Sequence, residues 1–365
     1  MDVITATADY EAWLARFCPL NTPDLDYKHT QMSDPTDAFP FFRGTYYRWV
    51  QLWPATCPDL NSAPRVLAVG DLHVENFGTW RDADGRLCWG VNDFDEVDRL
   101  PYTNDLVRLT ASARLARKSG VLDLKTPDIC QAILKGYHDA LSASGTPFVL
   151  EEQHPDLRTV AMAAERDPVR FWTKLTKLLD DPAVDPPPSA KAVLMRSLPA
   201  DGLTPAFRFR PKAGMGSLGR QRFVVLAKWR DSWICREAKT AAPAASVWAT
   251  GSAEIASKLT EAVSRAVRTP DPFYHLDDGW VCRRLAPHCS KIELAHLAKM
   301  DASRVLGAMG SETANIHLGT AGVAAEVLKD LAHRKAGWLE EAARAMSDAV
   351  EKDWKAWRAG RQDKK

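Results

Sequence analysis

The sequence contains no continuous apolar run of about 18 residues, the length that a membrane-spanning helix needs. It has no excess of either charge: 48 Lys and Arg residues face 47 Asp and Glu residues, which gives a formal net charge of +1. This balance argues against a nucleic-acid coat protein and against a polybasic membrane binder. The first residues carry an acid at Asp2 and no basic stretch before an apolar one, so they do not resemble a signal peptide.

Paired cysteines are also missing. The seven cysteines are odd in number and scattered, and no two of them form a C-x-x-C pair. This pattern argues against a disulfide framework and a zinc knuckle, and it predicts reduced thiols in a cytoplasmic protein. The 365 residues, of which 45% are hydrophobic and 26% charged, are enough for two globular parts.

The clearest division of the chain is the proline-rich segment 180–189, DDPAVDPPPS. Three consecutive prolines cannot continue a helix or a central strand, so we expect a stiff linker here. We therefore expect residues 1–185 to form a mainly helical part and residues 186–290 a smaller β-rich part. Residues 291–365 are expected to be helices that return to the first part.

In the first part, residues 65–69 and 87–91 are short apolar runs next to turn signals, and they predict buried strands. Three helices are expected after them. Asn104 is the expected N-cap of the first, Thr126 with the following proline opens the second, and Asp167 opens the third.

The second part begins with strand-like sequence. Residues 220–229 and 232–239 flank a short connection at Arg230 and Asp231, which predicts an antiparallel hairpin. Residues 279–287 are a further strand candidate, and from Lys291 the sequence is helical almost to its end.

The densest polar cluster, GDLHVENFG followed by VNDFDEVD, comes directly after the two strands predicted in the first part. Asp71 and Asn76 lie five residues apart, and Asp93 and Asp95 follow the next strand. Carboxylate and amide oxygens are ligands that Mg²⁺ prefers, and one more carboxylate in such a site can act as a base. The joint spacing favours a functional site over simple turn capping.

The second cluster is the glycine-rich segment Gly214–Gly219, a G-x-G-x-x-G pattern. A dinucleotide-binding fold would place a helix after the third glycine, but strand-like residues follow here. A glycine-rich turn between strands, with a cation such as Arg236 on the next strand, is typical of the phosphate-covering loop of protein kinases. Strand alternation would point Lys239 to the face opposite Arg236. The phosphate-contacting candidates are Gly214, Gly216, Ser217, Gly219, Arg236 and Lys239.

Asp71, Asn76 and Asp93 have the order and spacing of the catalytic base and the two metal ligands of kinases. GDLHVEN resembles the G-D-x-H-x-x-N loop of aminoglycoside and choline phosphotransferases, and NDFD resembles their metal-binding segment. In these loops a histidine such as His73 braces the backbone. YTNDLVRL resembles the helix whose buried Asp, here Asp105, supports the catalytic loop.

The chain as a whole resembles the bacterial family known as domain of unknown function 2252. The matching segments are FFRG (41–44), GDLHVENFG (70–78), VNDFDEVDRLPYTNDLVRLTAS (91–112), GMGSLGRQRFVVL (214–226), REA (236–238), VCRRL with a later Lys (281–291) and ANIH (314–317). The resemblance implies a distant relation to protein-kinase-like folds. One departure is Arg236, because the family usually has a Lys there. Either the Arg binds phosphate in its place, or nucleotide handling is altered.

The order of the two clusters is reversed relative to kinases, in which the glycine-rich part precedes the catalytic loop. The segment 303–318 resembles the helix that normally leads into that loop, so joining its end to Gly70 would restore the usual order. We therefore expect an α+β, two-lobed, protein-kinase-like fold that is circularly permuted. Permutation costs little where the old junction is an exposed loop and the termini lie close.

The expected function is ATP-dependent transfer of phosphate to a hydroxyl group of a small molecule. Asp71 would accept the hydroxyl proton with support from His73, and Asn76, Asp93 and Asp95 would hold Mg²⁺. No nucleic-acid or membrane partner is expected. His317 is expected to be a core or capping histidine.

Three alternatives stay open. A nucleotide-binding pseudokinase is favoured by the Arg236 departure. A metallophosphoesterase fits the opening D-x-H of Asp71 and His73, although the later motifs of that class are missing. The third alternative is transfer of the nucleotidyl group instead of the terminal phosphate, with ATP bound in the opposite orientation. Glu254 and Glu261 are both candidates for the helix Glu that orients the phosphate-binding cation, and the sequence does not choose between them.

Overall fold

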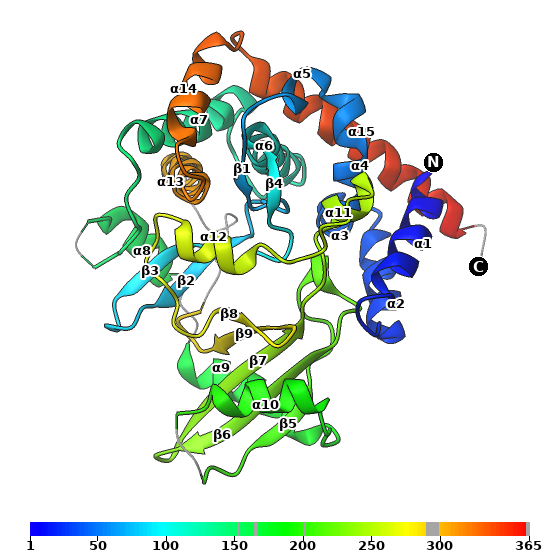
Figure 1. Cartoon of the computed structure of the whole chain (residues 1–365), viewed down its shortest axis with the longest axis vertical. Coiled ribbons are helices and arrows are strands. Elements are labelled where there is room, and N and C mark those ends of the chain that lie inside the picture. Colours follow the sequence, from blue (N-terminus) through cyan, green and yellow to red (C-terminus); the bar gives the residue numbers. More distant parts are fainter. Residues whose placement is uncertain (152, 164–166, 200–201, 290–298, 363–365) are drawn as a thin grey trace.

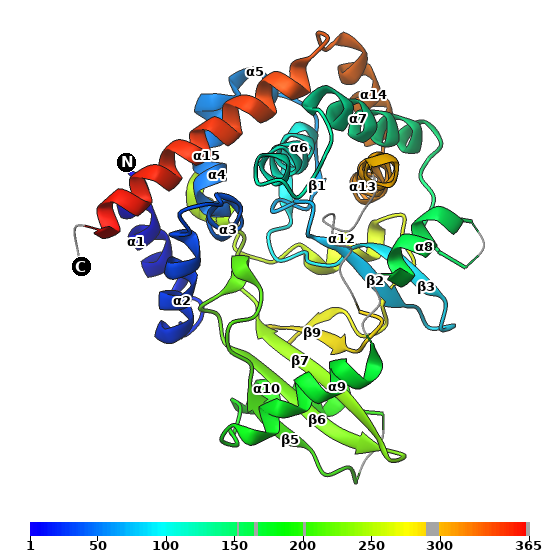
Figure 2. The same ribbon diagram turned by 180° about the vertical axis from the view of Figure 1, so that it is seen from behind.

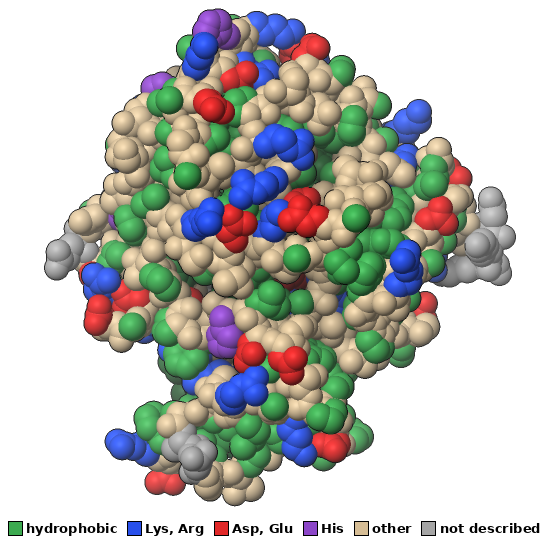
Figure 3. Space-filling view, viewed as in Figure 1, with side chains coloured by type: hydrophobic (Ala, Val, Ile, Leu, Met, Phe, Trp, Pro, Cys, Tyr) green, Lys and Arg blue, Asp and Glu red, His purple; other side chains and the backbone are tan. Residues whose placement is uncertain are grey.

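The computed structural model describes residues 1–151, 153–163, 167–199, 202–289 and 299–362. Figure 1 shows a larger, mostly helical part above a smaller part built around an antiparallel sheet. The architecture is α+β, as the sequence predicts. Figure 3 shows that the chain narrows between the two parts, and that acidic and basic side chains are mixed on this face.

The larger part begins with five helices, continues with four short strands, and is completed by helices from the middle and from the C-terminal region of the chain. The first helices are α1 (Val3–Leu14), α2 (Thr22–Met32), α3 (Phe39–Gly44), α4 (Tyr46–Thr56) and α5 (Pro58–Asn61). The strands are β1 (Arg65–Ala68), β2 (Phe77–Arg81), β3 (Leu87–Val91) and β4 (Asp98–Pro101). The later helices are α6 (Tyr102–Lys118), α7 (Thr126–Ser142), α8 (Pro155–Ala163), α13 (Lys299–His317), α14 (Val323–His333) and α15 (Trp338–Gln362).

The four short strands form two antiparallel pairs, β1 with β4 and β2 with β3. This pairing holds the two polar connections, residues 69–76 and 92–97, side by side. It does so through backbone contacts such as the hydrogen bond from the Asn92 amide to the Asn76 carbonyl (3.1 Å). The predicted strands at 65–69 and 87–91 are confirmed as β1 and β3.

The smaller part contains a five-stranded antiparallel sheet in the order β5-β6-β7-β9-β8. Its strands are β5 (Ala206–Phe209), β6 (Arg222–Trp229), β7 (Ser232–Thr240), β8 (His275–Asp277) and β9 (Trp280–Leu285). The predicted hairpin is confirmed, because β6 pairs with β7 across Arg230 and Asp231, which both have positive φ (50° and 63°). This is the backbone conformation of a tight two-residue hairpin turn.

Two helices cover opposite faces of this sheet (Figures 1 and 2). Helix α10 (Pro188–Arg196) packs Val193 and Leu194 against Phe223 and Val225, and α9 (Pro168–Thr176) packs Leu175 against Val224 on the other face. The short elements η1 (Lys177–Asp180) and η2 (Met215–Ser217) belong to this half. The two helices that follow β7, α11 (Ala245–Thr250) and α12 (Leu259–Arg265), pack instead into the core of the larger part. The prolines of the predicted linker run without regular structure into α10, whose first residue is the last of the three.

Two predicted helix caps are wrong. Asn104 is not an N-cap, because α6 begins two residues earlier at Tyr102, directly after β4. Asn104 is therefore a residue of the helix itself, and its side chain is buried. Thr126 is the first helical residue of α7, and Lys125 takes the cap position. A proline next to Thr126 fits either of the first helical positions, because both amides lack a helical acceptor. The cap at Asp167 is confirmed: its side chain accepts from the Arg170 amide (2.7 Å).

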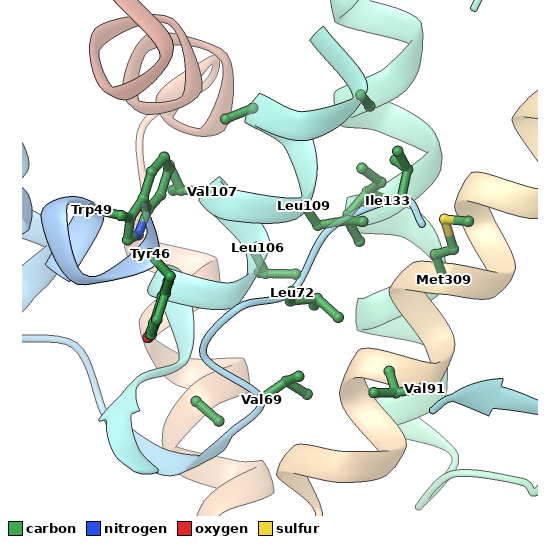
Figure 4. Close-up of a cluster of buried hydrophobic side chains, with 14 of the residues drawn as sticks. Tyr46, Trp49, Val69, Leu72, Val91, Leu106, Val107, Leu109, Ile133 and Met309 are labelled. Atoms are coloured by element: carbon green, nitrogen blue, oxygen red, sulfur yellow. The ribbon is translucent and has the colours of Figure 1, made fainter. Parts of the chain in front are cut away.

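The core of the larger part gathers side chains from segments that are far apart in the chain (Figure 4). Leu72 lies among Leu106 and Leu109 of α6, and Met309 of α13 belongs to the same buried cluster. Helix α13 packs closely along α7, and a Cβ at Gly136 would lie only 1.9 Å from the Gly307 carbonyl oxygen. This close crossing brings the end of α13 to β1. Lys291, where the sequence predicts that the last helical stretch begins, lies outside the described residues.

Helix α15 crosses the larger part and packs against α6, α4 and α1, so the two chain ends lie near each other (Figure 1). No helix among the described residues is long and apolar enough to cross a membrane.

Candidate active site

A cleft of about 1010 Å³ lies where the polar connections of the larger part face the sheet of the smaller part. Its lining includes the side chains of Asp71, His73, Asn76, Asp93 and Asp95. The residues Gly214–Ser217 of the glycine-rich segment line the same cleft. The structure therefore brings together the two polar clusters that the sequence analysis singled out.

The connection that carries Asp71 is anchored by a buried carboxylate below it. Asp105 of α6 accepts hydrogen bonds from the amides of Val69 (2.7 Å) and Gly70 (3.0 Å). Nε2 of His317 lies 3.0 Å from Asp105 Oδ2, and Nδ1 of the same ring lies 2.8 Å from the Tyr137 hydroxyl. His317 is fully buried, so it is a core histidine that holds Asp105.

The Asp71 carboxylate is fixed through one of its two oxygens. The buried Arg108 guanidinium donates from Nε (2.9 Å) and from Nη2 to Asp71 Oδ1, and Nη2 also donates to the Phe42 carbonyl (3.1 Å). Burial raises the pKa of Asp71, and the Arg108 charge opposes that rise. Oδ2 lies toward the glycine-rich segment, since a Cβ at Gly216 would be 3.2 Å from it.

Arg108 is held in turn by an aromatic pocket. Its guanidinium carbon lies 4.0 Å from the ring centre of Phe42, 4.8 Å from that of Tyr46 and 4.9 Å from that of Trp49. Faces of aromatic rings attract a cation, and more strongly where water is excluded. The aromatic pocket therefore allows a charged guanidinium at a fully buried position.

Asn76 presents a buried oxygen without a partner. Its Nδ2 donates to the carbonyls of Asp71 (3.2 Å) and Asp93 (3.1 Å), which fixes the orientation of the amide group. Its Oδ1 is then left without a hydrogen bond among the described residues. A buried acceptor in this state is costly, and a metal ion or a water molecule would satisfy it.

Asp93 and Asp95 face a lysine from the sheet. Lys239 Nζ contacts Asp95 Oδ2 and lies 3.6 Å from Asp93 Oδ1. Although desolvation alone would raise it, Lys239 and Arg283 hold the pKa of Asp93 well below its usual value. Asp95 Oδ1 is buried and has no partner among the described residues, whereas the Asp93 side chain is 44% exposed.

The structure does not bring Arg236 to the cleft. Arg236 lies on the opposite face of the sheet, where Nε donates to the Ser197 carbonyl (3.0 Å) after α10 and the guanidinium covers the Phe273 ring (4.2 Å). Lys239 is three residues further along β7 and therefore points to the other face, beside Asp93. Strand alternation predicts that the two residues lie on opposite faces, and the position of Arg236 does not fit the phosphate-side role predicted for it.

Neither helix Glu proposed to orient that cation reaches it. Glu254 pairs with Lys258 (2.9 Å), and Glu261 pairs with Arg99 and Arg265 (2.9 Å each). The carboxylate that contacts Lys239 is Asp95, from the metal-site candidates themselves.

The glycine-rich segment is held against the first helices of the chain. The Asn21 amide donates to the Gly219 carbonyl (2.7 Å), and the Lys212 amide donates to Asp24 Oδ1 (3.1 Å). Gly214 and Gly219 have positive φ (76° and 98°), which glycine adopts without strain. The segment therefore has a defined path over the Asp71 connection.

A second buried carboxylate organises cations under this segment. Glu237 of β7 contacts Arg210, accepts from Arg222 Nη1 (2.8 Å) and accepts from Arg283 Nε (2.7 Å). Arg222 Nη2 also donates to the Ser217 hydroxyl (2.8 Å). We call Arg210, Arg222 and Arg283 the arginine triad. It lines the cleft, and the three cations hold the pKa of Glu237 well below its usual value, although burial alone would raise it.

His73 and Glu96 make contacts that hold the two connections in place. His73 is buried, and its Nδ1 accepts from the Glu75 amide (3.1 Å). Glu96 accepts from Arg220 (3.2 Å) and from the Ala245 amide (2.6 Å), and burial raises the pKa of Glu96 to about 7.

Arg108 and Glu237 belong to the site but were not predicted from the sequence. Arg108 lies one turn after Asp105 on the same helix, and that i, i+3 spacing was the available signal. Glu237 stands inside the REA segment, but its three arginines come from three other places in the chain. Only the strand register puts Glu237 opposite Arg283 and Val224.

A Mg²⁺ ion fits the residues at this site by their chemistry. Magnesium takes oxygen ligands, uses one or two carboxylates and completes its shell with phosphate and water. The orphaned Asn76 Oδ1, the partly exposed Asp93 carboxylate and the unpaired Asp95 Oδ1 supply such oxygens. Among the residues that the structure describes, no group of three or more His, Cys, Asp or Glu side chains is arranged to hold a metal ion.

A family model described as an uncharacterized protein conserved in bacteria, domain of unknown function 2252, matches residues 23–177 and 206–360. The chain belongs to this family. The two ranges contain Asp71, Asn76, Asp93 and the glycine-rich segment, and they leave out the proline-rich segment and α10. The family match therefore covers both sides of the cleft. No curated protein and no solved structure matches the chain.

Proposed function

We propose that this protein is an ATP- and Mg²⁺-dependent phosphotransferase that acts on a hydroxyl group of a small molecule. One observation carries the proposal: the glycine-rich segment lies directly on the Asp71 connection, with Gly216 against Asp71 Oδ2. A glycine turn covers phosphates closely because it has no side chain in the way, and it aims backbone amides at them. A carboxylate directly beneath such a turn is placed to meet an acceptor hydroxyl.

The strand arrangement supports a protein-kinase-like fold. In chain order, the glycine-rich segment connects the first and second strands of the five-stranded sheet, and Lys239 lies on the third. Kinases place the phosphate-binding Lys on the third strand after a glycine-rich loop. We therefore assign this role to Lys239 rather than Arg236. This reassignment weakens the pseudokinase argument that rested on Arg236.

The end of α13 supports the proposed circular permutation. His317, the last residue of α13, contacts Asp105, and the Thr320 hydroxyl accepts from the Leu67 amide (2.7 Å) in β1. A direct link from α13 to β1 would span a short distance and would restore the kinase order.

In the proposed reaction, Asp71 Oδ2 accepts the proton of the acceptor hydroxyl while the oxygen of that hydroxyl attacks the terminal phosphorus of ATP. The bond from that phosphorus to the bridging oxygen breaks, and ADP leaves with the electron pair. Arg108 favours the ionised form of Asp71 against the effect of burial and holds it in one orientation through Oδ1. Asn76 and Asp93 would hold Mg²⁺, which neutralises phosphate charge when bound. Lys239 adds a further cation at the same place.

Thermal unfolding with nucleotides tests the proposal. A ligand at 100 times its Kd adds about 2.7 kcal/mol to the stability of the folded state, which is a visible shift in Tm. We expect a shift with ATP and Mg²⁺, a smaller one with ATP and EDTA, and none with ATP and Mg²⁺ in Asp93→Ala. Glu75→Gln is the matched control, because Glu75 lines the same cleft but pairs with Arg43.

Transfer itself is tested with γ-labelled ATP and a panel of hydroxylated metabolites and antibiotics. Label should appear on an acceptor with the unaltered protein and not with Asp71→Asn. Unchanged turnover in Asp71→Asn, or no nucleotide response at millimolar concentration, would overturn the proposal.

A nucleotide-binding protein without transfer activity is the second candidate. The specific observation in its favour is the Arg108–Asp71 ion pair, because the Arg108 charge opposes the rise in the pKa of Asp71 that burial causes and so makes Asp71 a weaker base than it would be unpaired. Binding of ATP with Mg²⁺ that depends on Asp93, together with no label transfer across the panel, would favour this candidate.

A further inference from the structure

The arginine triad carries more positive charge than its carboxylate partner can balance. Three guanidinium groups surround Glu237, and burial with the charges of Arg283 and Arg210 lowers the pKa of Arg222 although Glu237 opposes this. Crowded cations with too few counter-charges are unstable unless an anion joins them. Glu237 alone therefore does not balance the three guanidinium charges. Asp93 and Asp95 also act on the triad, but Lys239 pairs with both of these carboxylates.

The triad is rigid where it is buried and open where a ligand can reach it. Glu237 and Arg222 are almost completely buried, with side chains 1% and 4% exposed. Arg210 and Arg283 are 25% and 32% exposed, and both line the cleft. Glu237 thus fixes one end of each guanidinium and leaves nitrogen donors directed elsewhere. A planar guanidinium with fixed orientation matches the oxygens of a phosphate group well.

The position of the triad indicates the length of the anion. Arg222 donates to Ser217 in the glycine-rich segment, and Arg283 lines the same cleft as Asp93. An anion that touches the triad therefore also lies next to the segment and to the metal-site candidates. A single phosphate cannot span these groups as well as a chain of phosphates can.

We propose that the arginine triad, held in place by Glu237, is a binding site for a polyphosphate chain. The inference rests on the proposed function for the nucleotide attached to that chain, whereas the anion site itself does not depend on it. In this arrangement charge neutralisation is shared among guanidinium groups of β6, β9 and the residue after β5. Lys239, in contact with Asp95, adds its charge on the side of the metal-site carboxylates.

Isothermal titration with inorganic tripolyphosphate in EDTA tests the site without metal or nucleotide. We expect binding that weakens with salt, at least tenfold weaker binding in Arg210→Gln and in Arg283→Gln, and none detectable in the double variant. Arg283→Lys should recover part of the loss, because it keeps the charge but not the planar fork. Inorganic phosphate should bind more weakly than tripolyphosphate.

Arg170→Gln is the matched control. Arg170 is an exposed arginine of α9 that lines the same cleft and makes no contact with Glu237. We expect the affinity of the Arg170→Gln variant for tripolyphosphate to differ from that of the unaltered protein by less than twofold. If Arg170→Gln loses as much affinity for tripolyphosphate as the triad variants do, only the general positive field of the cleft attracts the anion. That result would overturn the proposal of a specific site. Absence of binding to the unaltered, folded protein would also overturn it.

The two proposals can fail separately. If tripolyphosphate binding depends on Arg210 and Arg283 while ATP with Mg²⁺ has no effect that depends on Asp93, the anion site stands and the phosphotransferase does not. If ATP with Mg²⁺ binds through Asp93 while the triad variants bind tripolyphosphate normally, the reverse holds. Near-ultraviolet circular dichroism of each variant establishes that it is folded before titration.

Discussion

Asp105 and Glu237 are both buried carboxylates beneath the same cleft, but they are satisfied in different ways. Asp105, in the larger part, receives two backbone amides and an imidazole. Glu237, in the smaller part, receives three guanidinium groups. The first therefore fixes the path of a backbone segment, and the second fixes the positions of charged side chains.

The difference shows how the two sides of the cleft are specialised. On the side of the larger part, hydrogen bonds without a large net charge hold the Asp71 connection in one shape. On the side of the sheet, the local charge is incomplete and depends on what enters the cleft. The first side should be insensitive to anions, whereas the stability of the second should rise when an anion binds.

Asp105→Ala should have the largest effect on stability. It leaves two buried amides and the His317 ring without their acceptor, at about 1–3 kcal/mol for each unsatisfied group. We expect a loss of about 4 kcal/mol in the free energy of unfolding, measured by urea denaturation and not restored by tripolyphosphate. Asp139→Ala, at an exposed position paired only with Lys135 and His138, is the control. A loss equal to that of the control would contradict the anchoring role.

Glu237→Gln should destabilise by about 3 kcal/mol, because it leaves buried arginines uncompensated. Unlike the loss in Asp105→Ala, this loss should be reversed in part by millimolar tripolyphosphate. Thermal unfolding with and without the anion measures the difference. If the anion stabilises both variants equally, the distinction between the two carboxylates is wrong.

Glu312 of α13 gives a pH-dependent test on the side of the larger part. Burial raises the pKa of Glu312 from 4.5 to about 7, so the folded state holds its proton more tightly than the unfolded state does. Stability from this group is present below pH 4.5 and is lost as the pH rises to 7. The loss is on the order of 2–3 kcal/mol.

Glu312→Gln should flatten the decrease of the unfolding free energy between pH 4.5 and 7. Glu326→Gln, an exposed position on α14, should leave it unchanged. An unchanged slope in Glu312→Gln would show that the carboxyl is ionised in the folded protein.

Arg108→Lys should have the smallest effect on folding but a specific effect on turnover. Lysine keeps the charge in the aromatic pocket but cannot hold both Asp71 and the Phe42 carbonyl as the guanidinium does. The pKa of Asp71 should rise because its counter-charge is less close. The acid limb of the pH–rate profile should then move to higher pH by less than about one unit, with little change in Tm. Arg114→Lys, at a partly buried position on the same helix, is the control for folding.

Local signals predicted much of the fold correctly. The strands at 65–69 and 87–91, the β6–β7 hairpin and the Asp167 cap follow from short-range patterns of apolar and turn residues. The helix starts at Asn104 and Thr126 were misjudged, because the preceding strand β4 and the Pro127 position decide where those helices begin. These boundaries depend on neighbours that a capping rule does not include.

The candidate site was predictable on one side of the cleft only. Asp71, Asn76 and Asp93 occur in two segments with characteristic spacing, so sequence reasoning could place them together. Whether Arg236 or Lys239 is the phosphate-side cation depends on which face of the sheet meets the larger part. Strand alternation predicts that the two residues lie on opposite faces, but it does not predict which face is turned to the cleft. The arginine triad was not predictable, because its members are neighbours only through strand register.

The pairing of Asp105 with His317 joins residues 212 positions apart in the chain. A ribosome adds about 5–20 residues per second, so Asp105 is synthesised roughly 10–40 s before its partner. Throughout that interval the GDLHVEN segment lacks both the imidazole beneath it and the α13 surface that packs against α7. The cleft is therefore completed late in synthesis, and a chain that stops before α13 carries the residues of the site without the anchor that shapes them.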